Sequence, residues 1–311
     1  LLNYFVRDFG CKSDKDLWVG TESGLYIYDL EKGEIAHLTV SNGNDSYALA
    51  DNAIYSICRD NEGGMWIGSY FGGVNYYPRQ WTYFEKFYPR DDIKNFGRRV
   101  REFCESNDGS VWIGTEDKGL FHFYPESGKI DKFSHPAIYQ NVHGLCLDGD
   151  DLWVGTFSGG LSRIDLLTKQ VRHYQKGISP NSLDANNVFS ICKTTSGDLW
   201  IGTTSGLLRY NRDTDDFTRM PELANMFVYK ILEDFSGNLW LATYSNGVFR
   251  YDVNKKEWKN FIFHKNDSTS LPYDKVISIC EDSRKRLWFM PQGAGFCRFN
   301  PENESFTRFD M

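Results

Sequence analysis

The chain has 311 residues, of which 16% are aromatic, and its 28 glycines far outnumber its 9 prolines. Strands favour aromatic and β-branched residues, and glycine supplies the positive-φ turns between them, so this composition favours an all-β fold. The formal net charge of −7 argues against a nucleic-acid-binding protein, and no apolar run approaches the roughly 18 residues that cross a bilayer.

One sequence unit recurs seven times along the chain, built around a Leu-Trp-Ile-Gly-Thr string such as residues 199–203. Its tryptophans, 40 to 48 residues apart, are Trp18, Trp66, Trp112, Trp153, Trp200, Trp240 and Trp288. Four short strands in a unit of this length are typical of a β-propeller blade. We therefore predict a single all-β domain over residues 1–311, a seven-bladed β-propeller with four-stranded antiparallel blades.

The expected strands follow one order in every unit, as the second unit illustrates. An apolar inner strand over 53–59 leads into an Asp-Asn-Glu-Gly turn, and the strand around Trp66 is apolar on both faces, as buried strands are. An alternating strand over 74–77 and an aromatic strand over 83–87 complete the sheet. The blades are expected at 1–40, 53–87, 99–133, 142–175, 187–219, 226–263 and 275–310, with no strand exchanged between the first and the last.

The tryptophan at the same strand position in every unit predicts a wedge between neighbouring blades. A single blade cannot bury both of its faces alone, so each indole is expected to fill the space that widens between two blades. All seven tryptophans are therefore predicted to be buried structural residues, and replacing one with alanine should cost about 3–5 kcal/mol.

Five cysteines share one position on the inner strands, seven or eight residues before the tryptophan: Cys58, Cys104, Cys146, Cys192 and Cys280. Equivalent positions on packed sheets are about 10 Å apart, beyond the reach of a disulfide. We expect free cysteines that serve as small apolar core residues. Cys11 and Cys297 fall outside this pattern and receive no assignment.

The sequence contains no motif for a metal or a cofactor, since its six histidines are scattered singly and no Cys-x-x-Cys occurs. Glu22, Glu116 and Asp117 lie in connections between second and third strands, where the paired carboxylates of a glycosidase would have to converge from different blades. Exposed loop acids are more often simply solvated. We expect no catalytic residue, metal or cofactor in this chain.

The position after Gly-Thr varies between blades, and in repeat proteins the variable loops carry function. Aromatic residues there suit the flat faces of sugar rings; the alternative is packing against a neighbouring loop. The starts of the inner strands border the same mouth, and two adjacent arginines there could pair an anion, the alternative being a solvated loop. The candidate ligand-binding residues are Tyr70, Phe157, Tyr244, Arg98, Arg99, Lys275 and Gln292.

The repeated string and its lead-in resemble the two-component regulator propeller repeat. Residues 181–191 match the opening of that family, Asn-Ser-Leu followed by Asn-x-Val-x-Ser-Ile, and residues 270–282 repeat it with Lys275 in place of Asn. The resemblance covers all seven units, and residues 289–292 of the last unit depart from it. It implies the periplasmic sensor region of a Bacteroides-type hybrid two-component system, which reports glycan-derived oligosaccharides to a histidine kinase and a DNA-binding regulator.

Three functions stay open at this point. The resemblance favours a non-enzymatic periplasmic module that binds an oligosaccharide, or helps a companion domain to do so. Such a module would signal by repacking against neighbouring propeller and β-sandwich domains within a homodimer. The second function is a rigid protein-interaction platform, and the third a propeller lyase or glycosidase. The chain begins without Met, and we expect it to be a piece of a longer inner-membrane protein that carries the kinase activity elsewhere; no nucleic acid is expected to bind this piece.

Overall fold

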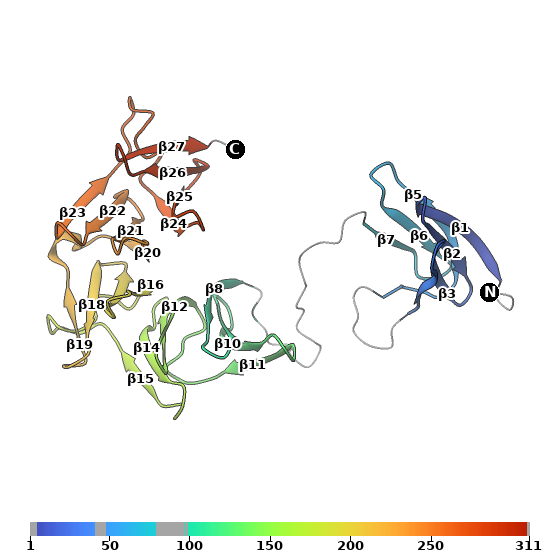
Figure 1. The fold of residues 1–311 in the computed structure, drawn as a ribbon. Helices are drawn as coiled ribbons and strands as arrows, with labels where there is room; N and C mark the ends of the chain where they lie inside the picture. Colours follow the sequence, from blue (N-terminus) through green and yellow to red (C-terminus); the bar gives the residue numbers. More distant parts are fainter. Residues whose placement is uncertain (1–4, 41–47, 79–96, 98, 310–311) are drawn as a thin grey trace. The chain divides into compact units, whose positions relative to one another are not determined.

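The computed structural model describes residues 5–40, 48–78, 97 and 99–309, and it is built almost entirely of β-strands, which confirms the all-β prediction. The described residues form six four-stranded sheets and one three-stranded sheet. The chain divides into two compact units, Leu1–Arg90 and Asp91–Met311, which are described separately (Figure 1). No helix in the described ranges is both long and apolar enough to cross a membrane.

The first unit holds two sheets. The first sheet consists of β1 (Val6–Ser13), β2 (Asp16–Thr21), β3 (Gly24–Asp29) and β4 (Gly33–Leu38). The second consists of β5 (Ile54–Arg59), β6 (Met65–Ser69) and β7 (Val74–Tyr77). The strand predicted over 83–87 lies outside the described residues.

The second unit holds five sheets. The third and fourth sheets consist of β8 (Val100–Glu105), β9 (Val111–Thr115), β10 (Gly119–Tyr124) and β11 (Lys129–Phe133), and of β12 (Val142–Asp148), β13 (Asp151–Thr156), β14 (Gly160–Asp165) and β15 (Val171–Tyr174). The fifth consists of β16 (Val188–Lys193), β17 (Leu199–Thr203), β18 (Leu207–Asn211) and β19 (Asp216–Arg219), followed by the 3-10 turn η2 (Pro221–Leu223). The sixth and seventh consist of β20 (Val228–Glu233), β21 (Leu239–Thr243), β22 (Val248–Asp252) and β23 (Glu257–Phe261), and of β24 (Val276–Glu281), β25 (Leu287–Pro291), β26 (Phe296–Asn300) and β27 (Ser305–Phe309).

Strand order within every sheet follows chain order, and neighbouring strands are antiparallel. The first and last sheets are therefore complete without an exchanged strand, as the sequence predicts. In the second unit, the first strands β8, β12, β16, β20 and β24 pack one beside the next. Figure 1 shows these strands on the inner side of the unit, with β15, β19 and β23 on its outer side.

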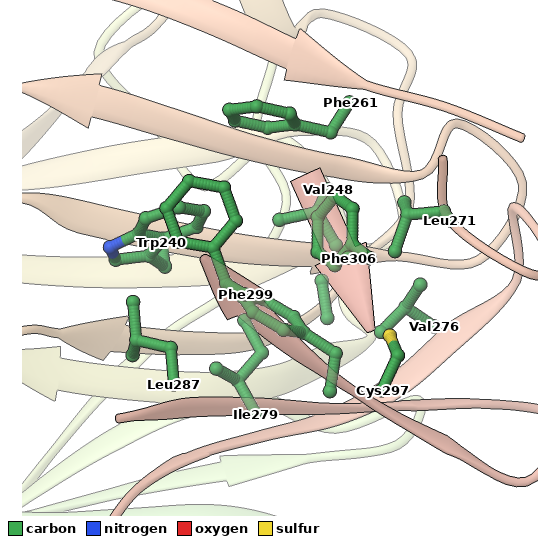
Figure 2. Packing of buried hydrophobic residues seen from close by; sticks show 12 residues of the cluster. Trp240, Val248, Phe261, Leu271, Val276, Ile279, Leu287, Cys297, Phe299 and Phe306 are labelled. Carbon is green, nitrogen blue, oxygen red and sulfur yellow. The ribbon is translucent and has the colours of Figure 1, made fainter. Parts of the chain in front are cut away.

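Apolar side chains from adjacent sheets interlock to form the core. Between the sixth and seventh sheets, the indole of Trp240 meets the ring of Phe299 edge-on, with centroids 4.9 Å apart, and Phe299 lies 5.4 Å from Phe306 (Figure 2). Trp240 belongs to the sixth sheet and both phenylalanines to the seventh, so the indole lies between two sheets as the repeat predicts. Offset and edge-on ring pairs of this kind each add about 0.5–1.5 kcal/mol beyond the burial of area.

The tryptophans are not all buried, which corrects the sequence prediction. Trp18, Trp112, Trp153 and Trp240 are at most 2% exposed, whereas Trp200 and Trp288 are partly buried and Trp66 is 46% exposed. Five indoles pack against the next sheet in the chain, those of Trp18, Trp112, Trp153, Trp200 and Trp240. Within their own units the second and seventh sheets have no next sheet. Trp66 instead contacts Tyr76 on its own sheet, with ring centroids 4.5 Å apart.

All seven cysteines are free, including the five that the repeat register predicts to be free, but these five are not all core residues. Burial raises the pKa of Cys192 to about 11 and that of Cys146 to about 12, so these thiols stay protonated among apolar neighbours. Cys58 and Cys280 are exposed, because they lie on the second and seventh sheets, whose faces are incompletely covered within their units. Cys297, which the repeat leaves unassigned, is buried in the core of the seventh sheet, and Cys11 is exposed.

Candidate functional site

Every inner strand carries a β-bulge one residue after its first Val or Ile. In β16, Val188 pairs with Thr203 and Ser190 pairs with Gly202, so Phe189 is an extra residue with no counterpart on β17. A bulge redirects a side chain out of the regular alternation of its strand. The bulge residues of the seven sheets are Arg7, Tyr55, Arg101, His143, Phe189, Tyr229 and Ile277.

The connection between the second and third strands is tied to the start of the inner strand in six of the seven sheets. The residue after Gly-Thr/Ser donates its backbone N–H to the carbonyl oxygen just before the inner strand, as Tyr244 does to Phe227 at 3.0 Å. Equivalent bonds of 2.8–3.2 Å join Tyr70 to Ala53, Glu116 to Arg99, Phe157 to Asn141, Thr204 to Asn187 and Gln292 to Lys275. The variable loops and the bulges therefore occupy the same end of each sheet.

In the second unit these positions bring together five aromatic side chains from the fourth, fifth and sixth sheets. We refer to them as the aromatic row: Phe157, Phe189, Phe227, Tyr229 and Tyr244. Ring centroids lie 6.2 Å apart for Phe157 and Phe189, 4.6 Å for Phe189 and Phe227, and 5.1 Å for Phe227 and Tyr244. The Phe227 and Tyr244 rings are nearly parallel, at 8°.

The two outer members of the aromatic row are accessible and its centre is buried. Phe157 is 43% exposed and Tyr244 is 42% exposed, whereas Phe189 is only 8% exposed. Phe189 therefore supports the row from below, while Phe157 and Tyr244 offer ring surface to a ligand. The Nζ of Lys275 lies 3.8 Å from the centroid of the Tyr244 ring and places a positive charge at that end of the row.

His143 adds a neutral polar group to the row. Its ring meets Phe189 edge-on at 4.5 Å, it is 7% exposed, and its Nδ1 has no hydrogen-bond partner among the described residues. Burial, together with the positive charge of Arg101, lowers the pKa of His143 to about 4. The imidazole is therefore uncharged at neutral pH, even though Glu116 Oε1 lies 4.0 Å from its Nε2.

A hydrogen bond and an ion pair join the inner strands of the third and sixth sheets. Arg101 Nη2 donates to the hydroxyl oxygen of Tyr229 at 2.8 Å, and Lys230 Nζ lies 3.0 Å from Glu102 Oε2. Arg101 also lies 3.4 Å from Glu116. These contacts link β8 to β20, and they fix the bulge side chains of both strands.

The first unit carries a similar but separate group. The Tyr55 and Tyr70 rings have centroids 4.9 Å apart, and the Arg7 guanidinium lies 4.7 Å above the Tyr55 ring while it forms an ion pair with Glu22. Tyr70 is 59% exposed and Phe71, which meets it edge-on, is 88% exposed.

The structure thus places four of the seven candidate residues in one neighbourhood: Phe157, Tyr244, Lys275 and Gln292. Tyr70 lies in the other unit, and Arg98 lies outside the described residues. Arg99 is exposed, and its carbonyl oxygen accepts from Glu116. Of the candidate acids, Glu22 and Glu116 each face an arginine.

Sequence reasoning missed Arg101, His143, Phe189, Phe227 and Tyr229. A signal was present, since the bulge residue stands eleven positions before the tryptophan in six repeats and ten before it in the fourth. That position differs in chemistry from repeat to repeat, while the Val or Ile before it stays constant. No group of three or more His, Cys, Asp or Glu side chains in the described part of the chain is arranged to hold a metal ion.

Comparisons with known proteins place these features in a family context. The model of the two-component regulator propeller family matches residues 48–71, 182–205 and 222–245. A curated protein, Histidine kinase P4 of Formosa agariphila, is 26% identical over 220 residues, which is 62% of this chain and 16% of that protein.

Solved β-propellers share the fold. Two are extracellular domains of putative hybrid two-component systems from B. thetaiotaomicron, at 22% and 23% identity with TM-scores of 0.59 and 0.57. They cover 99% and 97% of this chain, which spans 44% and 40% of their length. The WD40 β-propeller domain of Doa1 aligns over 99% of this chain and 94% of its own, at 16% identity and a TM-score of 0.51.

At these identities the solved structures show only that the fold is shared. The seven sheets are consistent with a seven-bladed β-propeller. The chain spans less than half the length of the bacterial sensors that it resembles. The family model matches segments of three of the seven units, which confirms the resemblance seen in the sequence, and two of the structural neighbours are extracellular domains of putative Bacteroides hybrid two-component systems.

Proposed function

We propose that the chain is the extracytoplasmic ligand-binding module of a two-component sensor, and that it recognises an oligosaccharide at the aromatic row. The observation that carries the proposal is the β-bulge repeated in every inner strand. The bulge aims one variable side chain per sheet to the same end, while the invariant Val or Ile beside it builds the scaffold. This division between scaffold and variable positions is typical of repeat proteins that bind ligands.

The chemistry of the row suits a neutral sugar. Pyranose rings present C–H groups on their faces, and those faces pack on aromatic rings such as Phe157 and Tyr244, each more than 40% exposed. Hydroxyl groups on the sugar edge need donors and acceptors. Lys275 supplies a donor beside Tyr244, and the neutral His143 holds an Nδ1 without a partner among the described residues.

The relatives support an extracytoplasmic, periplasmic location and a signalling role. Two of the structural neighbours named above are extracellular domains, and the curated relative is a histidine kinase. We propose that the parent protein of this chain carries kinase activity in another part, and that it spans the inner membrane there. Signal transfer would be a repacking of the propeller against neighbouring propeller and β-sandwich domains in a homodimer, driven by the ligand's differential affinity for two arrangements.

We propose further that the seven sheets are the blades of one seven-bladed β-propeller. Seven repeat units and propeller neighbours that align over nearly the whole chain support this proposal. We also propose that the chain has no catalysis of its own, since Glu116 faces Arg101 and His143 rather than a second carboxylate. A lyase structure is among the solved propellers, but at 15% identity and a TM-score of 0.50 it speaks for the fold alone.

Isothermal titration calorimetry against a panel of defined oligosaccharides tests the proposal. We expect at least one to bind, and we expect Tyr244→Ala to weaken that binding about tenfold or more, a loss of about 1.4 kcal/mol. Phe235→Ala is the matched control, because Phe235 and Tyr244 flank opposite ends of the same strand, β21. If no oligosaccharide binds while the intact sensor responds to one, the chain is a platform; release of a cleaved product would make it an enzyme.

A further inference from the structure

A pocket lies at the opposite end of the sheets from the aromatic row. It encloses about 510 Å³ between the β20–β21 turn of the sixth sheet and the β24–β25 turn of the seventh. Its inner wall includes Trp240, Leu287 and Phe299, whose packing Figure 2 shows. Phe235, 72% exposed, stands among the turn residues that line it. This volume accommodates a small ligand.

The lining of this pocket is basic in a chain that is acidic as a whole. Its cations are Arg250, Arg284, Lys285, Arg286 and Arg298, and its carboxylates are Asp234, Glu281 and Glu302. Two of the three carboxylates already serve the fold. Asp234 accepts from Trp240 Nε1 at 2.7 Å and from nearby backbone N–H groups, and Glu281 accepts from the Phe235 N–H at 3.0 Å.

Several of these cations have no carboxylate partner. Arg286 pairs with Asp282 and Arg250 with Glu304, but Arg284, Lys285 and Arg298 have no carboxylate within 4.0 Å among the described residues. The Nε–H of Arg250 is buried and has no acceptor in the described part of the chain. Buried donors are almost always satisfied in native proteins, so an unfilled donor in a pocket wall indicates a missing acceptor.

The turn between β24 and β25 carries Arg284, Lys285 and Arg286, and it holds Lys285 in an unfavourable left-handed backbone conformation. The same hydrogen-bonded turn occurs in the second, third, fifth and sixth sheets, where glycine takes the left-handed position, with φ from 79° to 90°. In the seventh sheet Lys285 takes it, with φ of 62°. A side chain costs stability in this conformation, and a cost retained at one copy of a repeat points to a role for that side chain.

We propose that this pocket binds a small ligand through an anionic group, a sulfate, a phosphate or a carboxylate. Unpaired guanidinium groups offer such oxyanions paired N–H donors, and Lys285 adds a point charge. Lys285 Nζ also lies 4.2 Å from the centroid of the Phe235 ring, so an apolar face and a positive charge stand side by side. The site is independent of the oligosaccharide site proposed for the aromatic row.

The test is a calorimetric titration of the chain with inorganic sulfate, inorganic phosphate, glucuronate and, as the uncharged match for glucuronate, glucose. We expect millimolar or tighter binding of at least one anion, weakened by added salt, and no binding of glucose at this pocket. Binding of sulfate or phosphate alone identifies an oxyanion site, and binding of glucuronate identifies a carboxylate site. The double variant Arg284→Gln/Arg298→Gln should weaken anion binding at least tenfold.

Lys285→Gly separates a binding role from a structural one. We expect it to weaken anion binding several-fold and to raise the melting temperature by about 2 °C, because glycine relieves the left-handed strain. Lys256→Gly is the matched control: Lys256 has φ of 56° in the β22–β23 turn and does not line the pocket, so it should raise the melting temperature alone.

Tyr244→Ala should leave anion binding unchanged, so the proposal for this pocket and the proposal for the aromatic row can be rejected independently. Absence of binding by all three anions would overturn the proposal, as would equal affinity for glucose and glucuronate. Unchanged anion affinity in both the double arginine variant and Lys285→Gly would overturn it as well.

Discussion

The guanidinium of Arg101 donates a 2.8 Å hydrogen bond to the hydroxyl oxygen of Tyr229, 128 residues later in the chain. Both are bulge residues: Arg101 lies on β8 of the third sheet and Tyr229 lies on β20 of the sixth sheet. These two sheets are not adjacent. The bond therefore spans the inner side of the second unit. It holds Tyr229, a member of the aromatic row, in a defined position.

Removing the acceptor of this bond should destabilise the second unit. We expect Tyr229→Phe to cost about 1 kcal/mol of unfolding free energy, because the hydrogen bond has a charged donor and is partly buried. The nearby pair of Glu102 and Lys230 should show a coupling energy below about 1 kcal/mol, since both side chains remain partly exposed. Urea denaturation of Tyr229→Phe and a double-mutant cycle on the ion pair measure both values. An unfolding midpoint that Tyr229→Phe leaves unchanged would show that the bond does not form in solution.

The indole N–H of Trp112 in the third sheet lacks a hydrogen-bond acceptor among the described residues, and one substitution should supply it. In the sixth sheet, Asp234 accepts a 2.7 Å hydrogen bond from the indole N–H of Trp240 six residues later. Ser106 takes the equivalent place before Trp112, and neither Ser106 Oγ nor Trp112 Nε1 has a partner among the described residues. We expect Ser106→Asp to stabilise the protein by about 1 kcal/mol and the reverse change, Asp234→Ser, to destabilise it by about 2 kcal/mol.

Thermal unfolding of these two variants checks the cap, and Ser106→Ala serves as the control because it offers no acceptor. A gain in Ser106→Ala equal to that in Ser106→Asp would assign the effect to something other than the indole hydrogen bond.

Stability should fall with acidification as His143 takes up a proton. Its pKa of about 4 in the folded state lies below the unfolded value of about 6.5, so the unfolded state binds the proton more readily. The contribution is therefore fully present above about pH 6.5 and is lost as the pH falls toward about 4, by about 3 kcal/mol at most. Arg101 and Glu116 are the charged groups that face the ring.

Melting temperatures measured across this range for the wild type and for His143→Phe give the comparison. We expect a flatter profile for the variant, with a residual slope because burial also lowers the pKa of His122 and of His173. Superimposable profiles would show that His143 titrates as an exposed histidine.

The exposed aromatic residues should matter for binding and not for stability. Tyr244→Ala and Phe157→Ala each remove a ring that is less than 60% buried, so we expect weaker oligosaccharide binding with little change in melting temperature. Tyr70→Ala tests the separate group in the first unit in the same way. Unchanged affinity in both Tyr70→Ala and Tyr244→Ala would reject both aromatic groups as binding sites.

The scaffold could be predicted from the sequence because its determinants are local and repeated. The strand around the tryptophan and the tryptophan spacing recur in every unit, and a hydrogen-bonded turn that begins with Asp, Ser or Thr precedes that strand in the second, third, fifth, sixth and seventh units. The register of the inner strands also followed from the repeat. Val188 and Val228 occupy the same position in their sheets because a constant apolar residue must face the core.

The site could be predicted only in part, because its contacts are not local. The placement of Phe157 and Tyr244 at one end of the sheets follows from their loops, but their meeting with Phe189 depends on three sheets packing together. The alternation of apolar and polar residues along a strand does not reveal a bulge, so the sequence does not distinguish the bulge residues from other strand residues. The exposure of Cys280 could not be predicted from the sequence either, because it depends on which sheet faces are covered and not on the register within a sheet.

The most direct test of the account is a crystal structure of the chain with the oligosaccharide that binds best in the calorimetric panel. We predict a sugar ring stacked on Tyr244 or Phe157, with its edge hydroxyls within hydrogen-bond distance of Lys275 or His143. A sugar bound away from the bulge residues, with the aromatic row uncovered, would contradict the assignment of this end of the sheets as the ligand site.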